Sequence, residues 1–111
     1  MKQKTLLNLG IEYFQQRGYY IEHDITLEGF SGLVYIFDLL IKKGQETHPV
    51  FIKDWKRTVG VNMIINADKA SENTHLSRPI IISNKFSDHA KSYSNKRRIT
   101  LLTKEDLQIK Q

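Results

Sequence analysis

The sequence predicts an α/β protein built on one mixed five-stranded sheet, and three observations lead to this fold class. The chain has 111 residues, so we expect residues 1–111 to form a single domain, without a second independent core. Short apolar runs of strand type alternate with apolar stripes of helical period. The first runs follow one another closely, as in an antiparallel meander, whereas the later ones are separated by helices, as in parallel crossover units.

A helix is predicted to open the fold. Within residues 5–17, Leu7, Ile11 and Phe14 have the i, i+4 and i+7 spacing of one helical face. Gly18 comes next and supplies the left-handed residue that commonly ends a helix. The expected apolar face of this helix is therefore the one that carries these three side chains.

Three strands are expected to follow. Residues 19–21 are of strand-forming type, and the glycines between positions 29 and 32 predict a turn. The apolar run over 33–42 predicts a second strand that is buried on both faces. A third strand is expected over 50–55, entered through Pro49.

The second half of the chain alternates helices and strands. A helix is expected to begin near Gly60, and a fourth strand is predicted at 80–82. Ser87 is an N-cap candidate for the next helix. After a fifth strand over 99–102, the Thr-x-x-Asp sequence that begins at Thr103 has the spacing of a capping box. The predicted order is therefore αβββαβαβ, followed by a short last helix.

Composition restricts the class of protein. Hydrophobic residues make up 40% and charged residues 26% of the chain, as in globular proteins. Cysteine is absent, which excludes disulfides and thiolate chemistry and suits a reducing compartment. The sequence shows no signal-peptide pattern and no apolar run long enough to span a bilayer, so a cytoplasmic location and no contact with a membrane are expected. The net charge of +5 favours an anionic partner, most commonly a nucleic acid.

Two charged residues interrupt apolar strands. Asp38 lies within the run over 33–42, and Lys53 lies within the third predicted strand. A buried charge is costly unless it is paired or binds a metal. If the two strands are neighbours, the carboxylate and the ammonium meet on one face of the sheet. Two interpretations stay open: an Asp–Lys ion pair that satisfies itself, or a site where a hard cation and a lysine bind a phosphate.

Several short motifs, taken in order, give the chain a resemblance to a known family. They are Gly29-Phe30-Ser31-Gly32, Phe37-Asp38-Leu39-Leu40, Ile52-Lys53-Asp54-Trp55, Thr58-Val59-Gly60-Val61, Ile80-Ile81-Ile82-Ser83 and Ile99-Thr100-Leu101-Leu102. These motifs resemble the PD-(D/E)xK nuclease superfamily, and most closely its restriction-endonuclease-like branch of Mrr enzymes and archaeal Holliday-junction resolvases. The resemblance implies a restriction-endonuclease-like three-layer α/β/α fold around the mixed sheet, and DNA as the substrate.

The same resemblance implies roles for three residues. Asp38 would bind the catalytic metal, which is Mg²⁺ or Mn²⁺. Lys53 would be the motif lysine that orients the attacking water and stabilises charge in the transition state. Glu12, in the first predicted helix, matches an accessory acidic residue that helps to hold the metal in some members.

One position departs from the family pattern. The superfamily places Asp or Glu two residues before the lysine as the second metal ligand, and here that position is Phe51. Phenylalanine cannot ligate a metal ion. Glu12, Glu28 or Asp54 is expected to take over this role, and Asp54 ranks last because strand alternation points it away from Lys53.

Basic residues outside that site are candidates for contacts with DNA phosphates. They are Lys56, Arg57, Lys85, Lys91, Arg97 and Arg98. For any one of them a solvated helix face is the plainer explanation, but as a group they can neutralise phosphates. A homodimer is expected by analogy, because one small subunit covers little duplex.

The sequence thus leads to two functional hypotheses. The first is a metal-dependent DNA endonuclease that hydrolyses phosphodiester bonds at Asp38 and Lys53, with Glu12 as the helper carboxylate. The second is a nuclease-fold module that has lost the acidic residue at position 51 and binds DNA or a protein partner without cutting.

Overall fold

The computed structural model describes residues 4–108 of the chain. The elements in this range are α1 (Leu6–Gln16), β1 (Tyr20–Glu28), β2 (Val34–Lys43), β3 (Glu46–Lys53), α2 (Val61–Asn73), β4 (Ile80–Ser83), α3 (Asp88–Arg97), β5 (Thr100–Leu102) and α4 (Lys104–Gln108). This order is the one predicted. Over the same range, no helix combines the length and the apolar character needed to cross a membrane.

The five strands form one mixed sheet in the order β1-β2-β3-β4-β5. The pairs β1–β2 and β2–β3 are antiparallel, whereas β3–β4 and β4–β5 are parallel. The predicted meander and crossovers are therefore confirmed. Parallel pairing brings the carboxyl ends of β3 and β4 to the same edge of the sheet, where Lys53 lies opposite Ser83.

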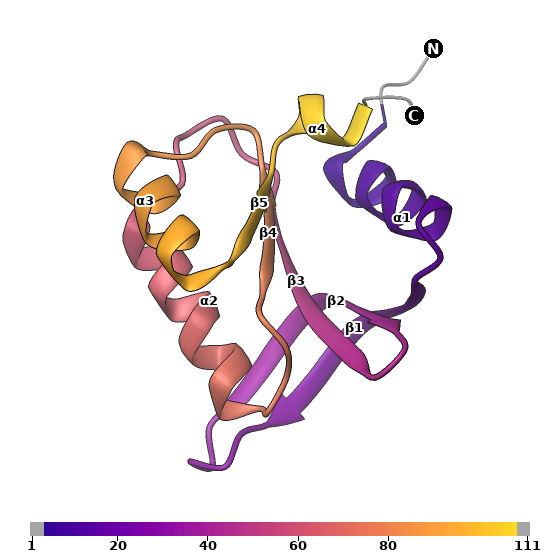
Figure 1. Ribbon diagram of the computed structural model, residues 1–111, viewed down its shortest axis with the longest axis vertical. Coiled ribbons are helices and arrows are strands. Elements are labelled where there is room, and N and C mark those ends of the chain that lie inside the picture. The colour runs from indigo at the N-terminus through magenta and orange to yellow at the C-terminus, as the bar shows by residue number, and fades with distance from the viewer. Residues whose placement is uncertain (1–3, 109–111) are drawn as a thin grey trace.

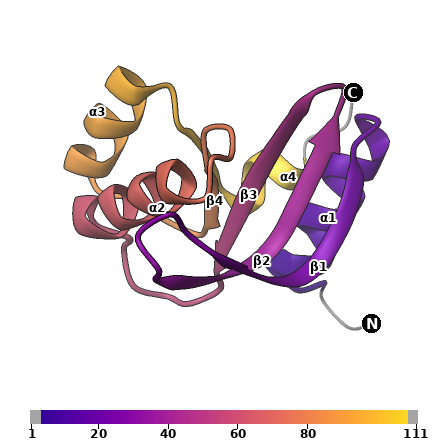
Figure 2. The same ribbon diagram turned by 90° about the horizontal axis from the view of Figure 1, so that it is seen from below.

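Helices cover both faces of this sheet, which confirms the three-layer α/β/α architecture (Figures 1 and 2). On one face α1 and α4 lie over the sheet, and their apolar side chains form a cluster with buried side chains of β2 and β3, among them Leu39 and Val50. On the other face α2 and α3 contribute Ile64 and Ala90 to a cluster that contains Ile81 of β4.

The apolar face of α1 is the predicted one at Phe14, which is buried, and at Ile11, which packs against the core, but not at Leu7. Leu7 is 39% exposed, and the helix also buries Leu6, Leu9 and Gly10. Gly10 explains the difference, because a Cβ atom there would lie only 3.0 Å from Cδ1 of Ile82. The helix comes closest to the sheet at a residue that has no apolar side chain, so a hydrophobic pattern cannot reveal it.

The prediction that β2 is buried on both faces is wrong for its first half. Val34 and Ile36 are 61% and 72% exposed, whereas Leu39 and Ile41 are buried. The pairing of β2 with β3 begins only at Leu39. The first half of the strand therefore pairs with β1 alone, and one of its faces remains open.

The predicted caps are confirmed at two helices. Ser87 accepts a hydrogen bond from the backbone N–H of Ala90 at 3.1 Å, which fixes the start of α3. Thr103 and Asp106 form a reciprocal capping box, in which each side chain accepts a hydrogen bond from the other residue's backbone N–H. Both helices thus begin where their first polar side chains satisfy free backbone donors.

Candidate functional site

The site begins where β2 and β3 separate. Their ladder ends at the pair Leu39–Val50. Beyond it, the Asp38 carboxylate Oδ2 accepts a hydrogen bond from the backbone N–H of Ile52 at 2.7 Å. A side chain thus satisfies a strand donor that the ladder no longer reaches, and this contact holds the carboxylate between the two strands.

The alternation of side chains breaks at Asp38. Phe37 and Leu40 belong to the cluster on the α2 side, whereas Leu39 and Ile41 belong to the cluster on the α1 side. In a regular strand Phe37 and Leu39 would share a face. The irregularity is shared with β1, where the facing residue Asp24 has φ +49°. This local distortion lets the half-buried Asp38 turn toward β3.

Lys53 is the last residue of β3, and its face is the one predicted. Phe51 and Trp55 pack on the α2 side, whereas Ile52 packs on the α1 side. Lys53 Nζ lies 5.6 Å from the centre of the Trp55 ring, and the Lys53 carbonyl accepts a hydrogen bond from Ser83 Oγ at 2.9 Å. Among residues 4–108 no ion pair joins Lys53 to Asp38, so the self-satisfied pair is not what holds this lysine.

Glu12 and Asp54, two of the candidate helper carboxylates, interact with residues other than Asp38 and Lys53. Glu12 on α1 forms an ion pair with Lys4 at 2.8 Å. Asp54 accepts a hydrogen bond from the backbone N–H of Leu6 at 3.3 Å, so it faces α1, away from the Lys53 side chain, as predicted.

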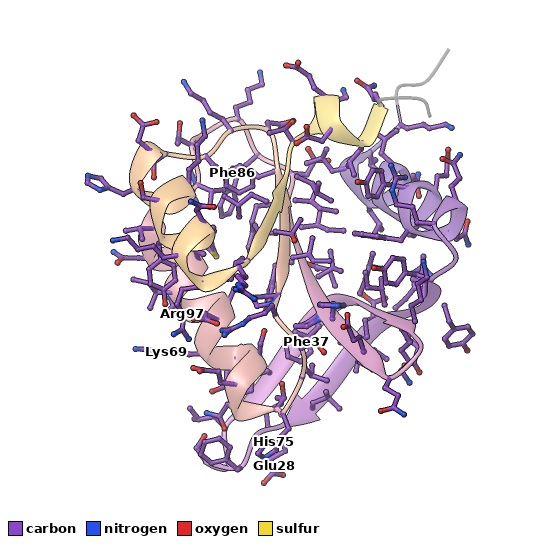
Figure 3. All side chains as sticks on the ribbon, viewed as in Figure 1. Glu28, Phe37, Lys69, His75, Phe86 and Arg97 are labelled. Atoms are coloured by element: carbon purple, nitrogen blue, oxygen red, sulfur yellow. The ribbon has the colours of Figure 1, made fainter. Side chains whose placement is uncertain are left out.

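Glu28 is the last residue of β1, at the turn of the β1–β2 hairpin and at the lower end of the molecule in Figure 3. Glu28 pairs with Val34, and Val34 is four positions along β2 from Asp38, which is about 13 Å. In the described part of the chain, no three or more His, Cys, Asp or Glu side chains form a group able to hold a metal ion.

Phe51 stands where the family pattern has an acidic residue, and its side chain packs against the core. Its ring lies 5.4 Å from the ring of Phe37 in an edge-to-face arrangement, and it packs against the apolar clusters on the α2 side. Phe37 lies on that side too, in a cluster with Ala70 of α2. The aromatic pair thus replaces a ligand position with hydrophobic packing.

The predicted phosphate-binding residues fall into two groups. Lys56, Arg57 and Lys85 follow β3 and β4 at the carboxyl edge, where the Lys85 carbonyl accepts a hydrogen bond from the Val59 N–H, and the Arg57 guanidinium stacks 4.0 Å from the centre of the Trp55 ring. The second group is on α3 and at its end, and consists of Lys91, Arg97 and Arg98. Because β5 starts there and runs parallel to β4, Arg98 lies toward the opposite edge from Lys53.

The Arg97 guanidinium forms ion pairs with two carboxylates, those of Asp68 and Glu72. It lies between α2 and α3 (Figure 3), donates a hydrogen bond from Nε to Asp68 at 2.9 Å, and pairs with Glu72 at 3.3 Å. The hydrogen bond to Asp68 raises the pKa of the Arg97 guanidinium. Burial, together with a hydrogen bond to Asp68, raises the pKa of the Tyr93 hydroxyl. This geometry gives Arg97 a structural task on the α2–α3 face.

Sequence reasoning missed Asp68, which is only 2% exposed. The sequence pattern could have revealed this residue, because Asp68 follows Ile64 by one helical turn on the buried face of α2. A carboxylate on an apolar helical stripe requires partners, and Arg97 and Tyr93 provide them.

A mixed five-stranded sheet between two helical layers, with an aspartate and a lysine where β2 separates from β3, defines a protein of the restriction-endonuclease-like class. Over residues 1–109 the chain matches the model of a restriction endonuclease family, Mrr_cat. The chain therefore belongs to this family, and a nuclease-type function in general follows from that membership.

A solved structure shares the fold. It is titled "Crystal Structure of Protein of Unknown Function AF1548", and it superimposes with a TM-score of 0.78 at 14% sequence identity. The similarity covers 88% of this chain and 57% of that one, so this chain spans little more than half the length of that protein. A comparison with curated proteins finds no match.

The donor set at Asp38 fits a weakly held divalent cation. One carboxylate oxygen is engaged by the Ile52 N–H, and within residues 4–108 the other oxygen makes no hydrogen bond. Mg²⁺ in proteins is commonly bound through one or two carboxylates, with the remaining ligands from water and substrate phosphate. The residues present therefore suit an ion that binds together with a phosphate, rather than one held by the protein alone.

Proposed function

We propose that the chain is a divalent-metal-dependent DNA endonuclease whose active site contains Asp38 and Lys53. The observation that carries this proposal is the placement of both residues on neighbouring strands where β2 and β3 separate. In a chain of the restriction endonuclease family, that is the chemistry the two side chains can perform together. The nucleases of this family generally require a divalent metal, and Mg²⁺ or Mn²⁺ is the proposed ion.

Each side chain has a defined task in this proposal. The free oxygen of Asp38 would hold the cation, while the hydrogen bond from Ile52 fixes the orientation of the carboxylate. When bound, such an ion polarises a phosphoryl oxygen and lowers the pKa of coordinated water. The Lys53 ammonium would stabilise the negative charge that develops on the phosphate. Glu12 would act as the helper carboxylate after leaving Lys4, which its exposed ion pair permits because such pairs are weak.

Binding of the DNA backbone belongs to the same proposal. Lys56, Arg57 and Lys85 border Lys53 at the carboxyl edge of the sheet and would contact phosphates first. Lys91 and Arg98 would extend the contact along α3, whereas Arg97 would contribute only if it leaves its carboxylates. We further propose that the chain forms one domain and acts as a homodimer, so that two subunits cover a duplex.

A second candidate function is favoured by Phe51. Its ring packs on Phe37 in the core, so the second ligand position carries no oxygen. A domain with this change can keep the fold and the basic edge and bind DNA or a protein partner without cutting.

Nicking of supercoiled plasmid distinguishes the two functions. The wild type would be compared with Asp38→Asn and Lys53→Gln in the presence of Mg²⁺ or Mn²⁺, and DNA binding would be measured by gel retardation on the same samples. Asparagine keeps an oxygen that can accept the Ile52 hydrogen bond, so the loss of activity would not reflect misfolding. Cleavage by the wild type and not by the variants supports the endonuclease. Retarded but uncut DNA with all three proteins supports the binding module.

A further inference from the structure

The ring of Trp55 holds two cations, and one of them is the lysine of the proposed active site. Lys53 Nζ lies 5.6 Å from the centre of the ring, and the guanidinium carbon of Arg57 lies 4.0 Å from it. Both distances are within the range of a cation–π interaction. Among residues 4–108 neither cation forms an ion pair, so the ring is the contact that orients both head groups.

The ring itself is fixed in the structure. It packs against the apolar cluster on the α2 side of the sheet. Two successive residues at the end of β4 hold the backbone on either side of Asp54. Ser83 Oγ donates a hydrogen bond to the Lys53 carbonyl at 2.9 Å, and Asn84 Nδ2 donates one to the Trp55 carbonyl at 3.0 Å. The two flexible cationic side chains therefore rest on a surface that does not move with them.

Packing alone does not explain why this residue is a tryptophan. Its Nε1 atom is buried and has no hydrogen-bond partner among the described residues, which is unfavourable and uncommon in native structures. A phenylalanine would fill an apolar cluster without that cost. The indole adds the ring face that attracts cations most strongly. Because a ring carries no net charge, it orients a cation without neutralising it, as a carboxylate would, and the charge remains available to an anion.

We propose that Trp55 is a positioning residue that holds Lys53 and Arg57 in place for the phosphates of a nucleic-acid strand. The identity of this anion rests on the proposed function, whereas the contact of the two cations with the ring does not. Immobilising a long, flexible side chain opposes binding. A ring that restricts Lys53 and Arg57 before the strand arrives reduces this cost. Trp55 thus contributes to the affinity for nucleic acid through these two residues.

Binding of a labelled duplex, measured by fluorescence anisotropy without divalent metal, tests this role. Trp55→Leu should weaken binding about fivefold, because two side chains lose their support, and Trp55→Phe should keep part of the affinity because it retains a ring. Phe86→Leu removes a ring from the same apolar cluster and is the matched control, with nearly unchanged affinity. In a protein that carries Lys53→Gln and Arg57→Gln, Trp55→Leu should have no further effect. An unchanged affinity for Trp55→Leu, an equal loss in both backgrounds, or an equal loss for Phe86→Leu would overturn the proposal.

The contact can also be measured in the free protein by NMR. The ring current of an indole shifts the proton resonances of groups above its face to higher field. The side-chain methylene resonances of Lys53 and Arg57 should therefore move to lower field in Trp55→Leu, whereas those of Lys56, which has no ring contact in the described part of the chain, should not. Unchanged resonances of Lys53 and Arg57 would refute the contact.

These measurements separate the positioning role from the proposed function. Neither requires cutting, so a protein that fails the nicking experiment can still show the role of Trp55. Nicking by a wild type that binds DNA no better than Trp55→Leu would refute the positioning role alone. Ring contacts in a protein that binds no duplex would refute the assignment of the anion to a nucleic-acid strand.

Discussion

At the scale of single residues, the two oxygens of the Asp38 carboxylate have different roles. One oxygen replaces a missing backbone acceptor for Ile52, and the other is available for a cation. The first contact is structural and the second is functional, so a substitution can remove them together or separately. This distinction determines which variant gives an interpretable result.

The two substitutions of Asp38 should differ in stability but not in activity. Asp38→Ala leaves the half-buried N–H of Ile52 without its acceptor, which should lower the free energy of unfolding by about 1–3 kcal/mol. Asp38→Asn retains an acceptor oxygen and should stay close to the wild type, while both variants lose metal-dependent cleavage. Urea unfolding measures the difference. Equal midpoints for Asp38→Ala and the wild type would show that the hydrogen bond contributes little.

Position 51 offers the complementary test. Phe51→Glu supplies the carboxylate that the family pattern expects and should tighten Mg²⁺ or Mn²⁺ binding at least about tenfold. Phe51→Gln is the control, since it has a similar size and no charge. Both variants lose the contact with Phe37 and should be destabilised by about 1–3 kcal/mol, because the ring is only half-buried. Calorimetry that finds the same metal affinity for Glu and Gln would mean that position 51 does not face the metal.

The sequence revealed the residues that break an apolar pattern, and it missed those whose role depends on a partner far along the chain. Asp38 and Lys53 could be selected because each interrupts a strand. The contact of Asp38 with Ile52 depends on where β2 leaves β3, and no sequence period encodes that point. Likewise, the pairing of Arg97 with Asp68 joins two helices across 29 residues, so the sequence could not reveal this internal ion pair, and the phosphate contact of Arg97 stays a prediction.

At the scale of the elements, local chemistry predicted more than long-range packing. The caps at Ser87 and Thr103 involve residues three positions apart, and they were predicted correctly. The third strand was expected at 50–55 but runs from Glu46 to Lys53, because pairing with β2 extends it through Pro49. Edge strand β1 reaches Glu28 for the same reason. Strand boundaries are thus set by neighbours in the sheet rather than by their own residues.

The contact between α2 and α3 is expected to depend on Asp68. Arg97→Gln removes the guanidinium that pairs with this buried carboxylate, whereas Lys96→Gln removes a neighbouring exposed charge from the same helical turn. The first should lower the free energy of unfolding, because the buried Asp68 carboxylate loses its closest cation, with Arg78, 3.6 Å from Asp68, as a partial substitute. The second should change it little. Similar unfolding curves for the two variants would show that the pair does not hold the helices together.

At the scale of the whole molecule, topology decides how the net charge of +5 is distributed. The parallel arrangement of β3 and β4 brings residues that are 29 or more positions apart to one edge, as the hydrogen bond between Asn84 and Trp55 shows. The basic residues that follow these strands therefore lie beside Lys53, while those at the end of α3 lie toward the other edge. Net charge alone could indicate an anionic partner, but only the fold assigns it a location.

This distribution predicts the salt dependence of DNA binding. Each phosphate neutralised by the protein contributes a slope of about −0.9 to a plot of log affinity against log salt concentration. Lys56→Gln combined with Lys85→Gln should therefore make the slope shallower by roughly 1.8, in proportion to two lost contacts. The control combines Lys42→Gln with Lys69→Gln, which removes the same charge from β2 and α2, away from this edge, and should leave the slope nearly unchanged. Fluorescence anisotropy with a labelled duplex gives both slopes. If the two double variants lose slope equally, the protein binds DNA through its overall charge, and the carboxyl edge of β3 and β4 is not its binding surface.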